Sequence, residues 1–183
     1  MTGFGESSYR RNPAADPKEL ERLVHTYADP LVRYAYTIVG SSAVAEDMME
    51  DAFAHLLAYG GKFRDEASIR AWLYKVVHSK SIDYLRRHKK ELLLLDLEQV
   101  LCAGDLEENF LRRERDLILY RCLQRLPQQY REALQLKYLD GFDQAQICTI
   151  MGKSVKQVYN CLQRGRVALK ELLIQEGISN EDI

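Results

Sequence analysis

Residues 141–173 read GFDQAQICTIMGKSVKQVYNCLQRGRVALKELL, and this stretch decides the fold of the C-terminal part of the chain. Apolar residues recur at helical spacing on both sides of Gly152, where a glycine permits a tight turn. After the turn, at about 100° per residue, the apolar side chains share one sector and the polar side chains lie opposite. The apolar sector contains Val155, Val158, Leu162, Gly165 and Leu169. The pattern predicts a helix-turn-helix, although an ordinary amphipathic helix of a bundle has the same spacing.

The polar face of the second helix carries side chains that bind bases and phosphates. Residues 153–170 contain five Lys or Arg and no Asp or Glu, so nothing there repels phosphate. Lys, Gln, Asn and Arg are also the residues whose geometry suits base edges. We expect DNA contacts from Lys156, Gln157, Tyr159, Asn160, Gln163, Arg164 and Arg166.

The whole chain has the composition of a helical protein. Of its 183 residues, 46% are hydrophobic and 29% are charged, and only 4 Pro and 10 Gly interrupt long runs at helical spacing. The sequence therefore predicts an all-α fold. We expect Asp29-Pro30 to break or kink the first helix, and Ser68 to open a long helix that ends near Lys90.

The net charge of −1 hides a strong alternation along the chain. Residues 20–60 carry a charge of −4, residues 61–90 carry +6, residues 91–116 carry −5 and residues 153–170 carry +5. Two separate basic blocks predict two places where phosphates are bound. The acidic blocks indicate surfaces or linkers with another purpose.

Several classes of site are not expected from this sequence. Its four cysteines are too far apart for a CxxC metal clip, and its four histidines share no ligand spacing, so we expect no metal. No glycine-rich nucleotide loop and no nucleophile with a matching base can be identified, so we expect neither an enzyme nor a cofactor. No run is long and apolar enough for a signal peptide or a membrane span, which predicts a cytoplasmic protein without membrane insertion.

Two stretches resemble the sigma-70 family of transcription initiation factors. The C-terminal stretch has a Leu-Pro before an Arg-Glu helix, then a helix-turn-helix that ends in Arg164-Gly165-Arg166. The stretch AEDMMEDAFAHLLAYGGKFRDEASIRAWLYKVVHSKSIDYLRRHKK is similar to the N-terminal domain of the same family. The short acidic linker between them resembles that of the small extracytoplasmic-function (ECF) group.

The resemblance implies two small helical domains joined by an acidic linker. The N-terminal domain would hold core RNA polymerase and capture the melted minus-10 element, while the C-terminal domain would bind the minus-35 element as duplex. The expected segments are a flexible tail (1–17), a region 2-like domain (18–90), the acidic linker (91–116), a region 4-like helix-turn-helix domain (117–175) and a second tail (176–183).

The resemblance also assigns residues to partners. The seven residues of the recognition helix would contact the minus-35 element, and Asp47, Glu50 and Asp51 would dock on polymerase. Phe63 would stack on an extruded base. The melted minus-10 strand would be held by Lys62, Phe63, Arg64, Lys75, Ser79, Arg86 and Arg87.

The implied function is that of an alternative sigma factor that recognises and melts promoter DNA and is held inactive by an anti-sigma factor. A conventional helix-turn-helix regulator, or an adaptor that binds an anti-sigma protein and never initiates transcription, remains an alternative. The recognition helix also departs from the family pattern: Tyr159 stands for a usual Lys, Cys161 for a usual Arg and Gly165 for a usual Ala.

Overall fold

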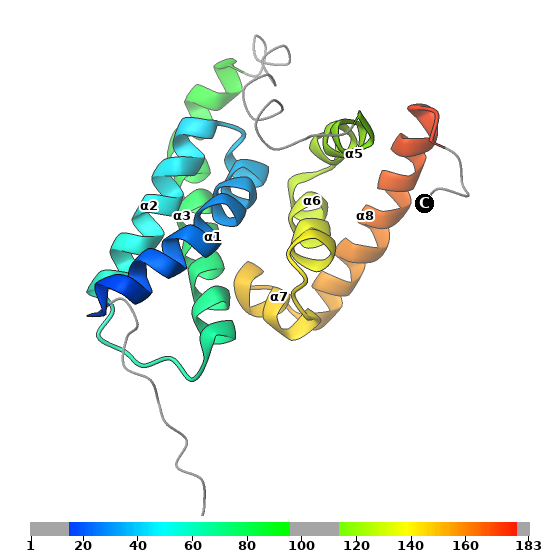
Figure 1. Cartoon of the computed structure of the whole chain (residues 1–183). Helices are drawn as coiled ribbons and strands as arrows, with labels where there is room; N and C mark the ends of the chain where they lie inside the picture. Colours follow the sequence, from blue (N-terminus) through cyan, green and yellow to red (C-terminus); the bar gives the residue numbers. More distant parts are fainter. Residues whose placement is uncertain (1–14, 96–113, 179–183) are drawn as a thin grey trace, which may run out of the picture.

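A computed structural model describes residues 15–95 and 114–178, which form the all-α fold that the sequence predicts (Figure 1). The N-terminal group contains α1 (Pro17–Val39), α2 (Ser42–Ala58) and α3 (Glu66–Leu95). The C-terminal group contains α5 (Glu114–Gln124), α6 (Gln128–Leu134), η3 (Gln135–Leu139), α7 (Gln144–Met151) and α8 (Val155–Gln175). Most of the two expected tails and of the acidic linker lies outside the described residues.

Capping residues set both ends of the first helix, and the helix continues through Pro30. The Asp16 side chain accepts a hydrogen bond from the Lys18 backbone N–H (3.0 Å), and Gly40 ends the helix with φ 73°. Of the two predicted outcomes at Pro30, the break is wrong, because α1 continues to Val39. Pro30 costs about 3 kcal/mol inside a helix. We attribute its tolerance to the apolar residues buried both before and after it.

The long helix α3 begins earlier and ends later than predicted. Ser68 does not open it; the Asp65 carboxylate accepts from the Ser68 backbone N–H (2.8 Å), and the Ser68 hydroxyl accepts from the Asp65 N–H (3.1 Å). This reciprocal cap starts the helix at Glu66. The hydrogen bond from the Ser68 backbone N–H to the Asp65 carboxylate holds the pKa of that carboxyl below its usual value. At its other end α3 runs to Leu95, into the range expected for the linker.

The helix-turn-helix predicted from residues 141–173 is present as α7 and α8. Each helix begins with a reciprocal capping box, formed by Asp143 with Gln146 and by Ser154 with Gln157. Gly152 makes the turn between them with φ 62°, a conformation that favours glycine.

A π-helical turn, η3, follows α6 directly. In η3 the Asp140 backbone N–H donates to the Gln135 carbonyl, five residues earlier (2.9 Å). Such turns commonly occur at functional positions. Here the turn brings Gln135 and Asp140 to the side of the C-terminal group that faces the N-terminal group.

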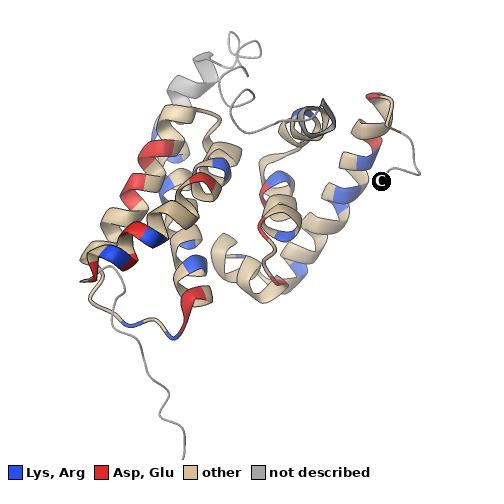
Figure 2. Cartoon of the chain, in the orientation of Figure 1, with Lys and Arg blue, Asp and Glu red and all other residues tan. Residues whose placement is uncertain are grey.

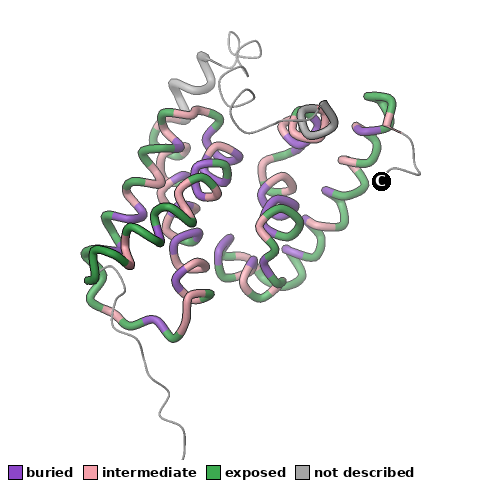
Figure 3. The backbone as a smooth tube through the Cα atoms, in the orientation of Figure 1, coloured by how far each residue is buried: buried purple, intermediate pink, exposed green. Residues whose placement is uncertain are grey.

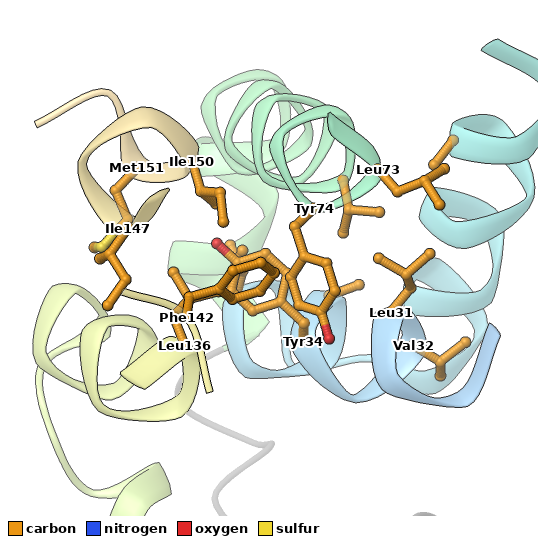
Figure 4. Packing of buried hydrophobic residues seen from close by; sticks show 14 of the residues in the cluster. Leu31, Val32, Tyr34, Leu73, Tyr74, Leu136, Phe142, Ile147, Ile150 and Met151 are labelled. Carbon is orange, nitrogen blue, oxygen red and sulfur yellow. The ribbon is translucent and has the colours of Figure 1, made fainter. Parts of the chain in front are cut away.

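One apolar core runs through both groups of helices. Leu73 and Tyr74 of α3 and Tyr34 of α1 continue into Leu136 and Phe142 of the C-terminal group (Figure 4). A second cluster, with Leu123, Leu126 and Leu134 at its centre, joins α5, α6 and α8. The two groups are therefore packed against each other.

Candidate nucleic-acid interface

The recognition helix α8 has one buried side and a long exposed side (Figure 3). Its buried residues are Val158, Cys161, Gly165 and Leu173, as helical spacing requires. Burial raises the pKa of the Cys161 thiol, as expected for a packed rather than a reactive cysteine. The expected DNA contacts are all exposed: Lys156, Gln157, Tyr159, Asn160, Gln163, Arg164 and Arg166.

The Gln157 side chain already has a hydrogen-bond partner in the protein without DNA. Its side-chain oxygen accepts a hydrogen bond from the Ser154 backbone N–H (2.9 Å), which completes the capping box of α8. A bidentate contact with adenine uses both the oxygen and the NH₂ group of a glutamine side chain. Gln157 must therefore give up this cap to make such a contact, whereas Asn160 lies one turn further along the exposed face.

Two apolar side chains at the start of α8 are exposed, and one of them was expected in the core. Val155 is 63% exposed and Tyr159, one turn later, is 53% exposed. The prediction that Val155 lies in the core is wrong. Val155 is the first residue of α8, and the buried part of the helix begins only at Val158. Apolar side chains on a helix that lies in the major groove can contact the methyl group of thymine.

Arg166 lies on a different side of α8 from Arg164. Residues two positions apart on a helix point about 200° away from each other. Arg166 lines a groove between α5, η3 and α8. The groove has a volume of about 520 Å³ and a mostly apolar wall that includes Leu119, Leu123 and Leu139. Sequence reasoning missed this groove, because its wall comes from α5, α6, η3 and α8, which are separate in the sequence.

The aromatic residue expected to stack on a base is buried. Phe63 is only 5% exposed and packs in the core between Tyr59 and Trp72, with ring centroids 5.2 and 5.8 Å away. The predicted stacking surface at Phe63 is therefore wrong for this structure. Tyr59, at 37% exposure, is the most exposed of the three aromatic rings. Helical spacing did not single it out, because it follows the last residue of α2.

The cations expected to hold the melted strand lie on α3 and in the loop before it, and Figure 2 shows Lys and Arg in blue on both. Lys62 and Arg64 are exposed in the loop, where Arg64 pairs with Asp65 (3.2 Å). At about 100° per residue, Lys75, Ser79 and Arg86 fall within one sector of α3. Arg87, also exposed, falls outside that sector.

The acidic helix α2 presents an exposed face that includes an apolar residue. Asp47 and Glu50 are exposed, and Leu57, which shares their side of the helix, is 55% exposed. Asp51 instead pairs with Lys80 of α3 (3.0 Å). This exposed pair contributes at most about 1 kcal/mol, so Asp51 can exchange partners.

Within residues 15–95 and 114–178, no cluster of three or more His, Cys, Asp or Glu is placed to hold a metal ion. No helix in this part of the chain combines the length and the apolar character that crossing a membrane demands.

The sequence and the fold were compared with those of known proteins. The family models described as Sigma-70 region 2 and Sigma-70, region 4 match residues 23–91 and 116–169. RNA polymerase sigma factor SigZ of Bacillus subtilis (strain 168) is 29% identical over 154 residues, which cover 84% of this chain and 86% of SigZ. ECF RNA polymerase sigma factor SigM of the same organism is 28% identical over 167 residues, which cover 88% of this chain and 99% of SigM.

Solved structures with both groups of helices share the fold. RpoE, crystallised with the anti-sigma factor NepR from Bartonella quintana, has a TM-score of 0.70 at 20% identity, covering 85% of this chain and 97% of RpoE. CnrH, in complex with the cytosolic domain of CnrY, has a TM-score of 0.60 at 22% identity, covering 90% of this chain and 93% of CnrH. Because both sigma-70 regions match in order and span about two thirds of the chain, the protein belongs to the sigma-70 family of RNA polymerase sigma factors, in its ECF group.

Proposed function

We propose that the protein is an alternative sigma factor that binds core RNA polymerase and directs it to specific promoters. The observation that carries this proposal is the presence, in one chain, of two separate exposed cationic surfaces and an exposed acidic helix (Figure 2). The α8 surface would read the minus-35 element as duplex. The loop before α3 and the Lys75 side of α3 would hold the melted minus-10 strand, and the Asp47 face of α2 would dock on polymerase.

In this proposal the protein acts by binding, and the chemistry belongs to polymerase. Cations would supply most of the affinity for phosphate, and exposed polar side chains of α8 would supply sequence preference. Such a protein works where core polymerase and the chromosome are, in the cytoplasm.

A reconstituted run-off transcription assay tests the proposal. Purified protein and core polymerase should give a defined transcript from a promoter selected from a random library, and neither component should do so alone. Tight binding of a short promoter duplex at physiological salt, without polymerase and without transcription, would instead identify a conventional helix-turn-helix regulator.

We also propose that a protein inhibitor of the anti-sigma class controls this factor. The structures of RpoE with NepR and of CnrH with CnrY hold such partners on proteins of the same fold. Titrating a purified candidate inhibitor into the run-off assay should abolish the transcript at about one inhibitor per sigma factor, and excess protein should restore it. A transcript unchanged at saturating inhibitor would rule out that candidate.

A further inference from the structure

Two exposed apolar side chains lie at the N-terminal end of α8, the end with which a helix-turn-helix protein approaches base edges. Val155 is the first residue of α8 and is 63% exposed, and Tyr159 is 53% exposed. Because they are four residues apart, they are neighbours on one side of the helix, with about 5–6 Å between their Cβ atoms. Their exposure shows that the rest of the described chain covers neither of them.

The surroundings of this apolar pair are cationic. Lys156 and Arg164 are exposed on the same helix, and residues 153–170 contain five Lys or Arg and no Asp or Glu. An apolar patch on another protein would offer no negative charge to these cations. The major groove of DNA offers phosphates along its edges and, at thymine, a methyl group among the base edges. The charge around the pair therefore favours DNA as its partner.

The polar side chains next to the pair are engaged in holding α8 in place. The Ser154 hydroxyl accepts from the Gln157 backbone N–H (3.3 Å), and the Gln157 side-chain oxygen accepts from the Ser154 backbone N–H (2.9 Å). The Val155 carbonyl accepts from the side-chain NH₂ of Gln144 in α7 (3.4 Å). The first turn of α8 is therefore fixed in position, and it presents an apolar side chain more readily than a free amide.

The pair is separate from the apolar groove beside Arg166. Leu139 and Val167 are also exposed, at 59% and 60%, but both line that groove. The groove wall includes neither Val155 nor Tyr159. The exposure of the pair is therefore not explained by whatever occupies the groove.

We propose that Val155 and Tyr159 are specificity-determining residues that select thymine in the minus-35 element by contact with its C5-methyl group. This rests on the proposed function, in which α8 reads that element as duplex. Thymine alone among the four bases presents a methyl group in the major groove, so apolar contact there distinguishes it from the other three. One turn of helix rises about 5.4 Å, and successive bases of a strand are about 3.4 Å apart. The two side chains can therefore contact neighbouring thymines.

Replacement of thymine by deoxyuridine tests the proposal, because it removes the methyl group and preserves the base pair. A promoter is first selected from a random library by run-off transcription with the wild-type protein and core polymerase. Each thymine of its minus-35 element, on either strand, is then replaced in turn. At least one replacement should lower transcription at subsaturating protein by about fourfold, the ratio expected when one methyl-sized group is no longer buried.

Alanine variants then assign the methyl contact to the pair. At a sensitive position, thymine and deoxyuridine templates should give equal transcription with Val155→Ala or with Tyr159→Ala, whichever removes the contacting side chain. Val167→Ala is the matched control, since it makes the same change on the same helix at 60% exposure, and it should keep the fourfold ratio. Circular dichroism checks that each variant remains helical.

Each other result overturns the proposal. A selected minus-35 element without thymine, or a wild type that responds to no deoxyuridine, would do so without any variant. A fourfold ratio that persists in both alanine variants would assign the methyl contact to other residues. Equal losses on both templates in those variants, with the ratio unchanged, would place the pair against the DNA backbone or polymerase. In all these cases the wild type still transcribes, so the sigma function stands, whereas a wild type that gives no transcript refutes the proposed function itself.

Discussion

The start of α8 contains both a helix cap and the residues that we propose for base recognition. Gln157 caps the helix through its side-chain oxygen, while Asn160 has no such duty in the hydrogen bonds of α8. Loss of the Gln157 contribution to the capping box would cost α8 a fraction of the roughly 1 kcal/mol that caps contribute. The two side chains should therefore respond differently to truncation.

Asn160→Ala should change which minus-35 sequences are used, by about 1–3 kcal/mol for a lost bidentate contact. Gln157→Ala should lower the thermal stability of the protein and alter sequence preference less, because its oxygen is held by the cap. Arg164→Ala should weaken all promoters alike and reduce the salt dependence by about one phosphate contact. A promoter library transcribed with each variant measures all three effects. Altered preference with Arg164→Ala, and uniform loss with Asn160→Ala, would reverse the assignment.

Gly165 stands where α8 crosses α6 closely. A Cβ atom placed on it would lie 3.2 Å from atoms of Tyr130 and Leu134, which explains the glycine at a position where the family usually has alanine. Gly165→Val should therefore lower the free energy of unfolding by about 1–3 kcal/mol through overpacking. Lys170→Val, at an exposed position of the same helix, is the control for β-branching. Equal denaturation midpoints for the two variants would show that α8 can move away from α6 at no cost.

The acidic helix α2 carries its charge and its exposed leucine on one side. Its other side packs Ala45, Ala52, Phe53 and Leu56 into the core. A charge reversal on the exposed side therefore changes the surface without touching the packing. This makes α2 the element on which polymerase docking can be tested most directly.

Asp47→Lys combined with Glu50→Lys should abolish association with core polymerase and preserve the helical circular dichroism spectrum. Co-elution in gel filtration measures the association. Glu21→Lys with Asp29→Lys makes the same change in net charge on exposed positions of α1 and should still co-elute. Loss of binding in both double variants would indicate a general effect of charge, and retention in both would exclude α2 as the docking face.

At the scale of the whole molecule, the packing of the two groups of helices against each other should depend on pH. Burial raises the pKa of Asp140 to about 6, although the Tyr74 hydroxyl and the charges of Arg70 and Arg33 act in the opposite direction. The packed arrangement therefore binds a proton at Asp140 more tightly than separated groups with an ordinary carboxylate would. Packing is favoured as the pH falls below about 6, and this contribution is lost as the pH rises through that value.

Scattering at pH 5.5 should accordingly show a more compact free protein than scattering at pH 7.5. Asp140→Asn imitates the protonated side chain, so it should be compact at both values. Glu171→Gln, at an exposed position of α8, should keep the wild-type response. A wild type that expands on acidification would give the opposite sign and refute the linkage to Asp140.

Much of the candidate site could be predicted from the sequence because it depends on neighbours a few residues apart. The exposed polar face of α8 follows from helical spacing around Val158 and Leu173. Phe63 could not be placed in this way, because Tyr59 and Trp72 cover it from two different segments. The apolar groove beside Arg166 could not be predicted either, because residues of α5, α6, η3 and α8 line it together.

The sequence by itself determined the helical class, the turn at Gly152 and the alternation of charge, because these depend on composition and on conformation within one turn of helix. The tertiary structure alone decided whether the helix survived Pro30 and how the two domains met. Those outcomes depend on the packing of distant segments, as in the bond from Tyr74 to Asp140, whose partners are 66 residues apart. Pairings at such separations are selected by the shape and chemistry of whole surfaces, which no local pattern in the chain records.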